Sequence, residues 1–234
     1  MLKVGIVGCG NIFTMHATSA DYLPNSTIVG VCDVKKDRAD KAAAKYNCKA
    51  YYDYKDLISK DNIDVVHICV PHYLHPIISR YALEKGVHVL CEKPLTVTAA
   101  EASELATLAK ERGVICGTVF NNRFLAPIMR ARQLIDEGKL GRILSFEFSY
   151  KHNSCIDPDR RVGWKQTAEY GGGTWYDLGP HVVDLCHYLC GELSFVLGKS
   201  QIAYPTHLRT DGTVWETDAD EAFYVICGTG DGAM

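Results

Sequence analysis

Two short segments of the sequence carry side chains whose types and spacing could move protons and balance charge. In the first, Cys91-Glu92-Lys93-Pro94 follows an apolar run, and Pro94 restricts Lys93 to an extended or turn conformation. A lysine fixed in this way can donate to a substrate oxygen and stabilise negative charge that develops there. Because a lone lysine at the end of a strand is more often a solvated surface residue, this segment needs support from other motifs.

The second segment begins at the glycines 171–173 and contains Asp177, Pro180 and His181. Asp177 and His181 are four residues apart, so a helix would place both on one face, together with Asp184. Pro180 is expected to kink this helix or to begin its regular part. A histidine oriented by a carboxylate can remove a hydroxyl proton near neutral pH, although a structural His–Asp pair would have the same spacing.

A glycine-rich turn near the N-terminus could cradle a phosphate group. Gly8 and Gly10 follow the first apolar run, as in the G-x-G-x-x-G/A pattern of dinucleotide-binding loops. The first glycine permits the tight turn, and the second lets the backbone approach a pyrophosphate at the helix N-terminus. The third position holds Phe13, which is larger than close helix–strand packing favours. A glycine turn in an α/β protein that binds no nucleotide is the alternative interpretation.

A carboxylate ends the second apolar run. Asp33 can accept hydrogen bonds from the hydroxyl groups of an adenosine ribose and would repel a 2′-phosphate, which favours NAD. Lys35 and Lys36 follow closely, so NADP is not excluded. A role as the N-cap of the next helix is the competing interpretation for Asp33.

Alternation of apolar runs and amphipathic stretches predicts how the first half of the chain positions these residues. Runs rich in Val, Ile and Cys, typical of parallel strands covered on both faces, occupy 2–7, 27–32, 65–70, 87–91 and 114–119. The clearest helical pattern lies at 98–112, where Thr98 and Glu101 form a capping box and Gly113 a stop. The predicted fold class is α/β, with a doubly wound parallel sheet of the Rossmann type over residues 1–121.

Residues 122–234 have a different pattern, which predicts an α+β domain with an open, mostly antiparallel sheet. A helix is expected at 127–137, and strand-like runs lie at 142–151, 195–203 and 222–227. About three such runs are fewer than the five or six strands of an average sheet, so we expect this domain to be truncated. The loop 153–170 is expected to shape the substrate site.

Composition and cysteine placement exclude several classes of protein. The chain has 234 residues, a formal net charge of −3 and 10 cysteines. The weakly negative net charge does not indicate the basic surface that binds nucleic acid. No apolar run approaches the roughly 18 residues that cross a bilayer. The N-terminus lacks the charged and apolar regions of a signal peptide. Because several cysteines lie in apolar runs, where a thiol behaves as a small hydrophobe, we expect a reduced, cytoplasmic protein without nucleic-acid or membrane partners.

A cluster of potential metal ligands at Cys186, His187 and Cys190 invites a zinc interpretation. The two cysteines have a one-sided helical spacing, and no second Cys/His pair stands at a spacing typical of zinc sites. We therefore interpret Cys186 and Cys190 as core residues and predict no metal site.

Taken together, these motifs resemble those of the Gfo/Idh/MocA oxidoreductases and occur in the order found in that family. The residues that carry the resemblance are the glycine turn at 8–10, Pro71-His72-Tyr73-Leu74-His75, Cys91-Glu92-Lys93-Pro94, Asn121-Asn122-Arg123-Phe124, and the glycines 171–173 with Asp177, His181 and Asp184. The resemblance implies an NAD(P)-binding Rossmann domain followed by a domain whose open-faced sheet shapes the substrate site. The sequence departs from the family pattern at two positions. Phe13 replaces a small residue, and Trp175 stands where an aliphatic residue is usual.

The resemblance also implies roles for individual residues. Lys93, Asp177 and His181 would form the catalytic set, with His181 as general base and the other two orienting the substrate and balancing charge. The residues expected to line the cofactor are Gly8, Gly10, Asn11, Ile12 and Asp33, with Pro71, His75, Glu92 and Lys93 nearer the nicotinamide. Arg123 and Trp164 would border the substrate.

The predicted function is hydride transfer between NAD, with NADP not excluded, and a secondary alcohol or ketone of a sugar, inositol or related polyol. A homodimer or homotetramer formed through the sheet of the second domain is expected. One alternative is an NAD-dependent glycosidase that oxidises its substrate transiently. The other is a regulator that binds NAD(P) without turnover, although such a protein would not need proton-transfer residues such as Lys93 and His181.

Overall fold

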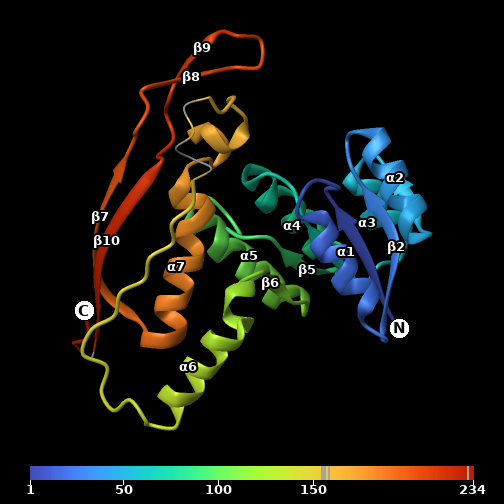
Figure 1. The fold of residues 1–234 in the computed structure, drawn as a ribbon. Coiled ribbons are helices and arrows are strands. Elements are labelled where there is room, and N and C mark those ends of the chain that lie inside the picture. Colours follow the sequence, from blue (N-terminus) through green and yellow to red (C-terminus); the bar gives the residue numbers. More distant parts are fainter. Residues whose placement is uncertain (154–156, 158, 231) are drawn as a thin grey trace. The chain divides into compact units, whose positions relative to one another are not determined.

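The structure is a computed structural model, and it describes residues 1–153, 157, 159–230 and 232–234. The chain divides into two compact units, Met1–Val119 and Phe120–Met234. We call these the N-terminal and the C-terminal unit and describe each by itself (Figure 1).

A six-stranded parallel sheet forms the centre of the N-terminal unit, in the order β3-β2-β1-β4-β5-β6. Its strands are β1 (Leu2–Val7), β2 (Ser26–Cys32), β3 (Lys49–Tyr51), β4 (Val65–Ile68), β5 (His88–Cys91) and β6 (Cys116–Thr118). This is the strand order of a doubly wound dinucleotide-binding fold, in which the direction of winding reverses between β1 and β4. The structure confirms the predicted fold class. It adds β3, a strand too short to give an apolar run.

Helices cover both faces of this sheet (Figure 1). They are α1 (Phe13–Tyr22), α2 (Lys36–Tyr46), α3 (Tyr54–Lys60), η1 (His72–Leu74, a short 3-10 helix), α4 (His75–Glu84) and α5 (Ala99–Arg112). Val4 and Ile6 of β1 pack in one core cluster with α1 and α2, whereas Val66 and Ile68 of β4 pack in a second cluster with α3, α4 and α5. Burying each such side chain contributes about 2 kcal/mol to stability, so the two faces of the sheet anchor it firmly.

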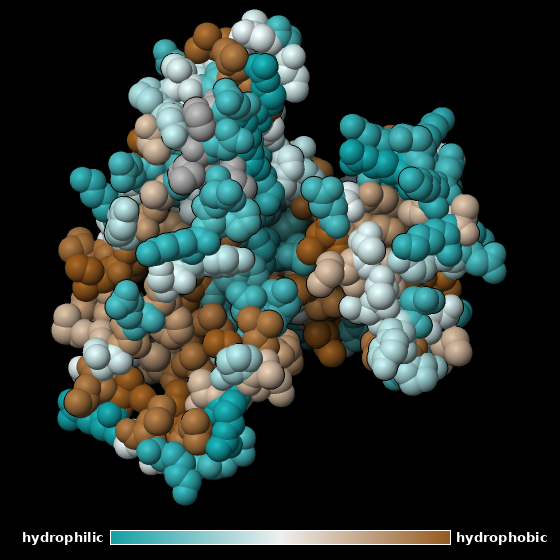
Figure 2. Space-filling view, in the orientation of Figure 1, coloured by the Kyte–Doolittle hydropathy of each residue, from teal (hydrophilic) through white to brown (hydrophobic). Residues whose placement is uncertain are grey.

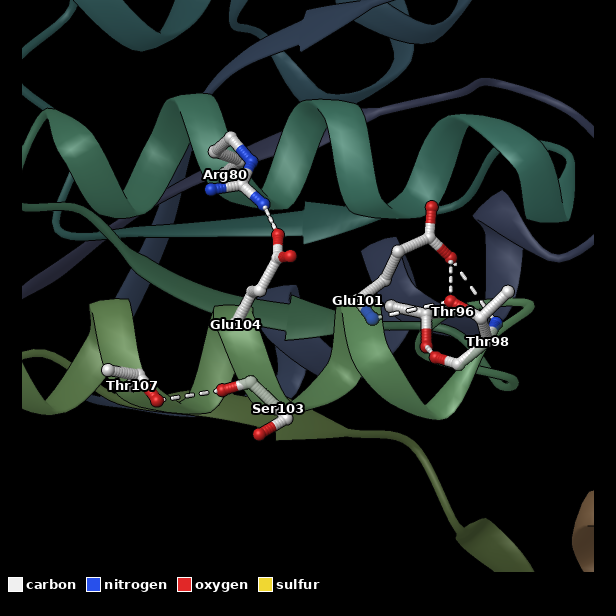
Figure 3. Close-up of polar contacts among 7 residues, drawn as sticks. All are labelled: Arg80, Thr96, Thr98, Glu101, Ser103, Glu104 and Thr107. Carbon is white, nitrogen blue, oxygen red and sulfur yellow. Dashed lines mark hydrogen bonds and ion pairs between the residues drawn. The ribbon is translucent and has the colours of Figure 1, made fainter.

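The helix α5 begins as the sequence predicts. The side chains and backbone amides of Thr98 and Glu101 exchange hydrogen bonds in a capping box (Figure 3). Gly113 closes the helix in the left-handed conformation. The same view shows Arg80 of α4 forming an ion pair with Glu104 of α5. These contacts fix α5, which follows directly from the turn that contains Lys93.

Among its described residues, the C-terminal unit has two long helices and two antiparallel strand pairs. Its elements are η2 (Asn121–Phe124), α6 (Ala126–Asp136), η3 (Trp164–Gln166), η4 (Ala168–Tyr170), α7 (Thr174–Cys190), β7 (Leu193–Gln201), β8 (Thr206–Leu208), β9 (Val214–Glu216) and β10 (Ala222–Thr229). The strand β7 pairs with β10, and β8 pairs with β9. The antiparallel pairing agrees with the predicted α+β domain.

The predicted strand at 142–151 is wrong, because the structure assigns no strand there. Alternating side chains form a strand only when a neighbouring strand supplies a ladder of hydrogen bonds. Here the backbone bonds with Met234 involve only Phe146 and Leu144, at N···O distances of 2.8 and 3.3 Å. The sequence interpretation also missed the β8–β9 hairpin, whose turn contains Gly212 at φ +86°.

Large apolar side chains are exposed on the outer strands of the C-terminal unit. They include Val196 and Leu197 of β7 and Tyr224 and Ile226 of β10. In Figure 2 apolar surface also gathers where Figure 1 draws α6 and α7. Among the residues that the structure describes, no helix is long and apolar enough to cross a membrane.

Candidate active site

The loop after β1 has the shape that a phosphate-binding turn requires. Gly8 has φ +96°, and a Cβ atom on it would lie 2.3 Å from the backbone oxygen of Cys69, so only glycine fits there. At Gly10, by contrast, a Cβ atom would meet no atom within 4 Å. The loop is therefore closed against β4 at Gly8 and open at Gly10, where a phosphate could approach the backbone.

Phe13 does not disturb this loop, although its size departs from the usual pattern. Its ring is buried and packs edge-on against Tyr46 of α2, with the ring centroids 5.8 Å apart. Asn11 and Ile12 lie exposed just before it. Within the described part of the chain no side chain caps α1, and its first amides are engaged only by carbonyls of the loop, such as Phe13 with Gly10 at 3.3 Å. These features fit the diphosphate of a dinucleotide.

Asp33 lies directly after β2 and connects this strand end to the glycine loop. Its Oδ2 accepts the amide of Cys9 at 2.9 Å, and its Oδ1 accepts the amide of Lys35 at 2.8 Å. The N-cap position of α2 belongs to Lys35, so the alternative N-cap role of Asp33 is wrong. The half-buried carboxylate is thus held at the loop, where it can still accept hydrogen bonds from ribose hydroxyls.

Lys93 lies in a turn whose backbone is held on both sides. The amide of Lys93 donates to Oε2 of Glu92 at 3.2 Å, and the Lys93–Pro94 peptide bond is cis. Nδ1 of His75 lies 2.6 Å from the carbonyl oxygen of Pro94. Lys93 itself is half-buried at the carboxyl end of β5, the edge where parallel sheets bind ligands.

The position of His75 changes how its predicted cofactor role must be interpreted. Its side chain is 0% exposed, and Nε2 lies 2.9 Å from the carbonyl oxygen of Val70. Burial lowers the pKa of His75 despite these carbonyl contacts, so at physiological pH the ring is neutral and donates a hydrogen bond to one of the two carbonyls. The ring therefore supports the turns that carry Pro71 and Lys93 and does not present itself to a ligand.

In the C-terminal unit the helix α7 carries the second group of candidate residues. Its N-terminus is fixed by Asp220, which accepts the amide of Trp175 at 2.8 Å. Gly173 precedes the helix with φ +103°, and a Cβ atom there would lie 2.3 Å from Oδ1 of Asp220. Trp175, the second departure from the family pattern, packs against Phe223 of β10, with ring centroids 5.1 Å apart. Its effect is thus on packing.

Asp177 and His181 lie one turn apart on this helix, which continues through Pro180. Because no break separates them, the predicted common face is present. Oδ2 of Asp177 accepts a hydrogen bond from Nζ of Lys165 at 2.7 Å. His181 is only 9% exposed, and its ring centroid lies 6.3 Å from that of Tyr150. The helix therefore places Asp177, whose carboxylate is already balanced by a cation, one turn from His181.

Asp184 continues the same face of α7 and binds Arg123. Nε of Arg123 donates to Oδ2 of Asp184 at 2.8 Å, and a terminal guanidinium nitrogen forms an ion pair with Oδ1. The guanidinium also lies over the rings of Phe120 and Tyr188, at 5.6 and 5.1 Å from their centroids. Arg123 therefore joins η2 to α7, and its predicted contact with substrate remains a proposal.

Two residues of this site were not found from the sequence. Lys165 contacts Asp177 and lies 5.6 Å from the ring centroid of Trp164, so it links that predicted substrate neighbour to the helix. Asp220 fixes the start of α7 from 45 positions away along the chain. Neither belongs to a local motif, and only the adjacency of Lys165 to Trp164 could have indicated it.

Some predictions concern other parts of the chain. Of the loop 153–170, residues 154–156 and 158 lie outside the described residues. Among the residues described, no group of His, Cys, Asp and Glu could hold a metal ion. Burial raises the pKa of the Cys186 thiol to about 12, as expected for a core cysteine.

Comparison with known proteins relates both units to one family. Residues 2–120 match the GFO/IDH/MocA oxidoreductase family with an NAD-binding Rossmann fold, and residues 128–234 match the GFO/IDH/MocA C-terminal domain. Levoglucosan dehydrogenase of Pseudarthrobacter phenanthrenivorans is 31% identical, and the match covers 83% of this chain and 53% of the relative. Glucose-6-phosphate 3-dehydrogenase of Bacillus subtilis is also 31% identical, over 90% of this chain and 59% of the relative.

A solved structure shows the same similarity. Levoglucosan dehydrogenase in complex with NADH and L-sorbose superposes with a TM-score of 0.94 at 26% identity, covering 100% of this chain and 65% of that protein. In these three matches the chain spans between 53% and 65% of the length of the protein it resembles.

Proposed function

The chain belongs to the GFO/IDH/MocA oxidoreductase family, and from this premise we propose that it catalyses NAD-dependent hydride transfer to and from a sugar. The reacting group is a secondary alcohol, or the corresponding ketone, of a sugar, inositol or related polyol. The observation that carries the proposal is the set of candidate residues that follow the carboxyl ends of four neighbouring strands of the sheet: Gly8 and Gly10 after β1, Asp33 after β2, Pro71 after β4 and Lys93 after β5.

The strand ends support NAD as the cofactor. Gly10, Asn11 and Ile12 leave the diphosphate an open approach to the start of α1. Asp33 offers carboxylate oxygens to the ribose hydroxyls and would repel a 2′-phosphate, which supports NAD over NADP. When bound, the nicotinamide supplies or accepts the hydride.

The side chains proposed for catalysis divide the remaining chemistry. Lys93 donates from Nζ to the substrate oxygen and stabilises charge that develops on it. His181 takes the hydroxyl proton; because Nδ1 is buried, we assign this step to Nε2. Asp177 orients the substrate, and Lys165 balances the charge of the Asp177 carboxylate, with Nζ 2.7 Å from Oδ2. Arg123 and Trp164 are proposed to border the substrate.

The substrate class is supported by the relatives, whose names specify levoglucosan and glucose 6-phosphate as substrates. We further propose a homodimer or homotetramer, because Leu197, Tyr224 and Ile226 share one face of the β7–β10 pair and are exposed there, where association would bury them. A cytoplasmic location is proposed from the cysteines in buried strands.

The test is a panel of levoglucosan, glucose 6-phosphate, inositol and other polyols, mixed with NAD or NADP and followed by NADH absorbance. We expect reduction of NAD with at least one member and slower reduction of NADP. Product formation without net NADH would instead support transient oxidation. Stoichiometric NAD binding without any turnover would support the non-catalytic alternative and contradict the proposal.

A further inference from the structure

Three ionisable side chains form a buried chain beneath the turn that carries Lys93. Nε2 of His16, on α1, lies 2.9 Å from Oε1 of Glu92, and Nδ1 of His16 lies 3.4 Å from Nδ1 of His67 on β4. The His16 side chain is 6% exposed and that of Glu92 is 14% exposed. Neither histidine has a part in the proposed chemistry, although burying such groups is costly unless they are paired.

The protonation states of these three side chains follow from their contacts. Burial raises the pKa of Glu92, but the hydrogen bond and charge of His16, together with Lys93, outweigh burial, so the pKa falls below its usual range. Glu92 is therefore a carboxylate at neutral pH, and Nε2 of His16 must carry the hydrogen in their contact. Burial and the neighbouring His16 lower the pKa of His67 to about 4, so that ring is neutral.

The carboxylate of Glu92 connects His16 to the backbone of Lys93. Its Oε1 faces His16, while its Oε2 accepts the Lys93 amide at 3.2 Å. The amide of Glu92 donates to the carbonyl of Ile68 on β4 at 3.0 Å. On the other side of Lys93, His75 contacts the carbonyl of Pro94 at 2.6 Å. The backbone around Lys93 is thus held from α1, β4 and α4.

We propose that His16 is a positioning residue for Lys93, because it orients the Glu92 carboxylate that holds the Lys93 backbone. The contact also joins α1, the helix that begins at the glycine loop, to the turn after β5. The kinetic consequence rests on the proposed function, whereas the hydrogen-bond arrangement does not. A purely structural role would stabilise the fold without changing the Lys93 amide or turnover.

The first experiment follows the Lys93 amide by NMR as the pH is lowered. An amide that donates to a carboxylate shifts as that carboxylate is protonated. Other ionisable groups facing Glu92 are Lys93 itself, His75 of α4, and the thiols of Cys69 and Cys91. These groups are unchanged in a His16→Leu variant, so the difference between variant and wild type isolates His16.

In the wild type we expect the Lys93 amide to titrate with a midpoint below the usual pKa of Glu. In His16→Leu the midpoint should rise, because burial then acts without the opposing histidine. His16→Gln keeps an N–H donor in a similar place and should give an intermediate midpoint; it also provides the test if the leucine variant does not fold. A Lys93 amide that does not titrate in the wild type, or midpoints equal in all three proteins, would overturn the inference.

The second experiment separates positioning from folding through turnover. His16→Leu should lower kcat roughly 10- to 100-fold, the scale expected when a catalytic group is slightly misplaced, with KM for NAD changed less than about 3-fold. His16→Gln should recover most of this loss. His67→Leu is the matched control, since it removes the other ring contact of His16 and leaves Glu92 paired; its kcat should stay close to wild type.

The two proposals fail in different ways. A wild-type protein that turns over no sugar or polyol contradicts the proposed function, while the amide titration still decides whether His16 acts on Lys93. Turnover in the wild type with an unchanged kcat in His16→Leu contradicts the positioning role and leaves the proposed function standing.

Discussion

The two units of the molecule fix their candidate functional side chains by different means. In the N-terminal unit these side chains follow strand ends, and contacts with the backbone hold them, such as that of Asp33 with the Cys9 amide; the backbone beside Lys93 is held by the contact of His75 with the Pro94 carbonyl. In the C-terminal unit they lie on one helix and are held by side chains from distant segments, namely Lys165, Asp220 and Arg123. The first arrangement should depend on backbone geometry, and the second on individual charges.

The largest expected effect concerns the turn after β5. Lys93→Ala should lower kcat by roughly 10²- to 10⁴-fold, because it removes the donor proposed to stabilise the substrate oxygen. The affinity for NADH, measured by fluorescence titration, should stay nearly unchanged because the glycine loop and Asp33 are intact. Unaltered turnover would remove Lys93 from the mechanism.

A pair of glycine substitutions tests the importance of backbone geometry in the N-terminal unit. Gly8→Ala should lower the free energy of unfolding by about 3 kcal/mol, because it places a side chain at φ +96° and against the Cys69 carbonyl. Gly10→Ala has room for its methyl group, so its stability should change by less than about 1 kcal/mol while NADH binding weakens. Urea unfolding measures the first quantity and fluorescence titration the second. Equal losses of stability in both variants would be inconsistent with the geometry of this loop.

The importance of charge in the C-terminal unit is tested at Asp184. Asp184→Ala should cost about 2 kcal/mol of stability, because Arg123 loses a buried carboxylate, although its own 39% exposure lets water replace part of the contact. Asp136→Ala is the matched control, since it breaks the exposed pair with Arg132 and should cost less than about 0.5 kcal/mol. If urea unfolding gives the two variants the same stability, the charge contact does not hold η2 to α7.

The smallest expected effect is at Lys165. Lys165→Met keeps much of the aliphatic stem but leaves Asp177 without its cation, so KM for the sugar should change by roughly 2- to 5-fold, with little change in kcat. Added salt should produce part of the same change in the wild type and less in the variant, because the pair is partly exposed. A KM that depends equally on salt in both proteins would show that this ion pair does not tune the site.

The contrast also explains what could be predicted from the sequence. In the N-terminal unit, strand ends and the turns that follow them are neighbours in sequence, so Gly8, Asp33 and Lys93 could be assigned to one sheet edge. In the C-terminal unit, Lys165 and Asp220 reach α7 from segments that share no motif with it. The hairpin β8–β9 could have been found from Asp211-Gly212, a strong turn signal. The strand predicted at 142–151 could not have been rejected, because pairing partners are absent from a local pattern.

The central claim is that hydride passes between a sugar carbon and NAD, and the fate of that hydrogen tests it most directly. Levoglucosan, glucose 6-phosphate and inositol, each deuterated at the carbinol carbons, would be incubated with the protein and NAD, and the cofactor analysed by mass spectrometry. We expect deuterium in NADH with at least one of these compounds for the wild type, and a loss of label by orders of magnitude for Lys93→Ala. A cofactor that binds stoichiometrically and stays unlabelled with every compound would contradict the claim.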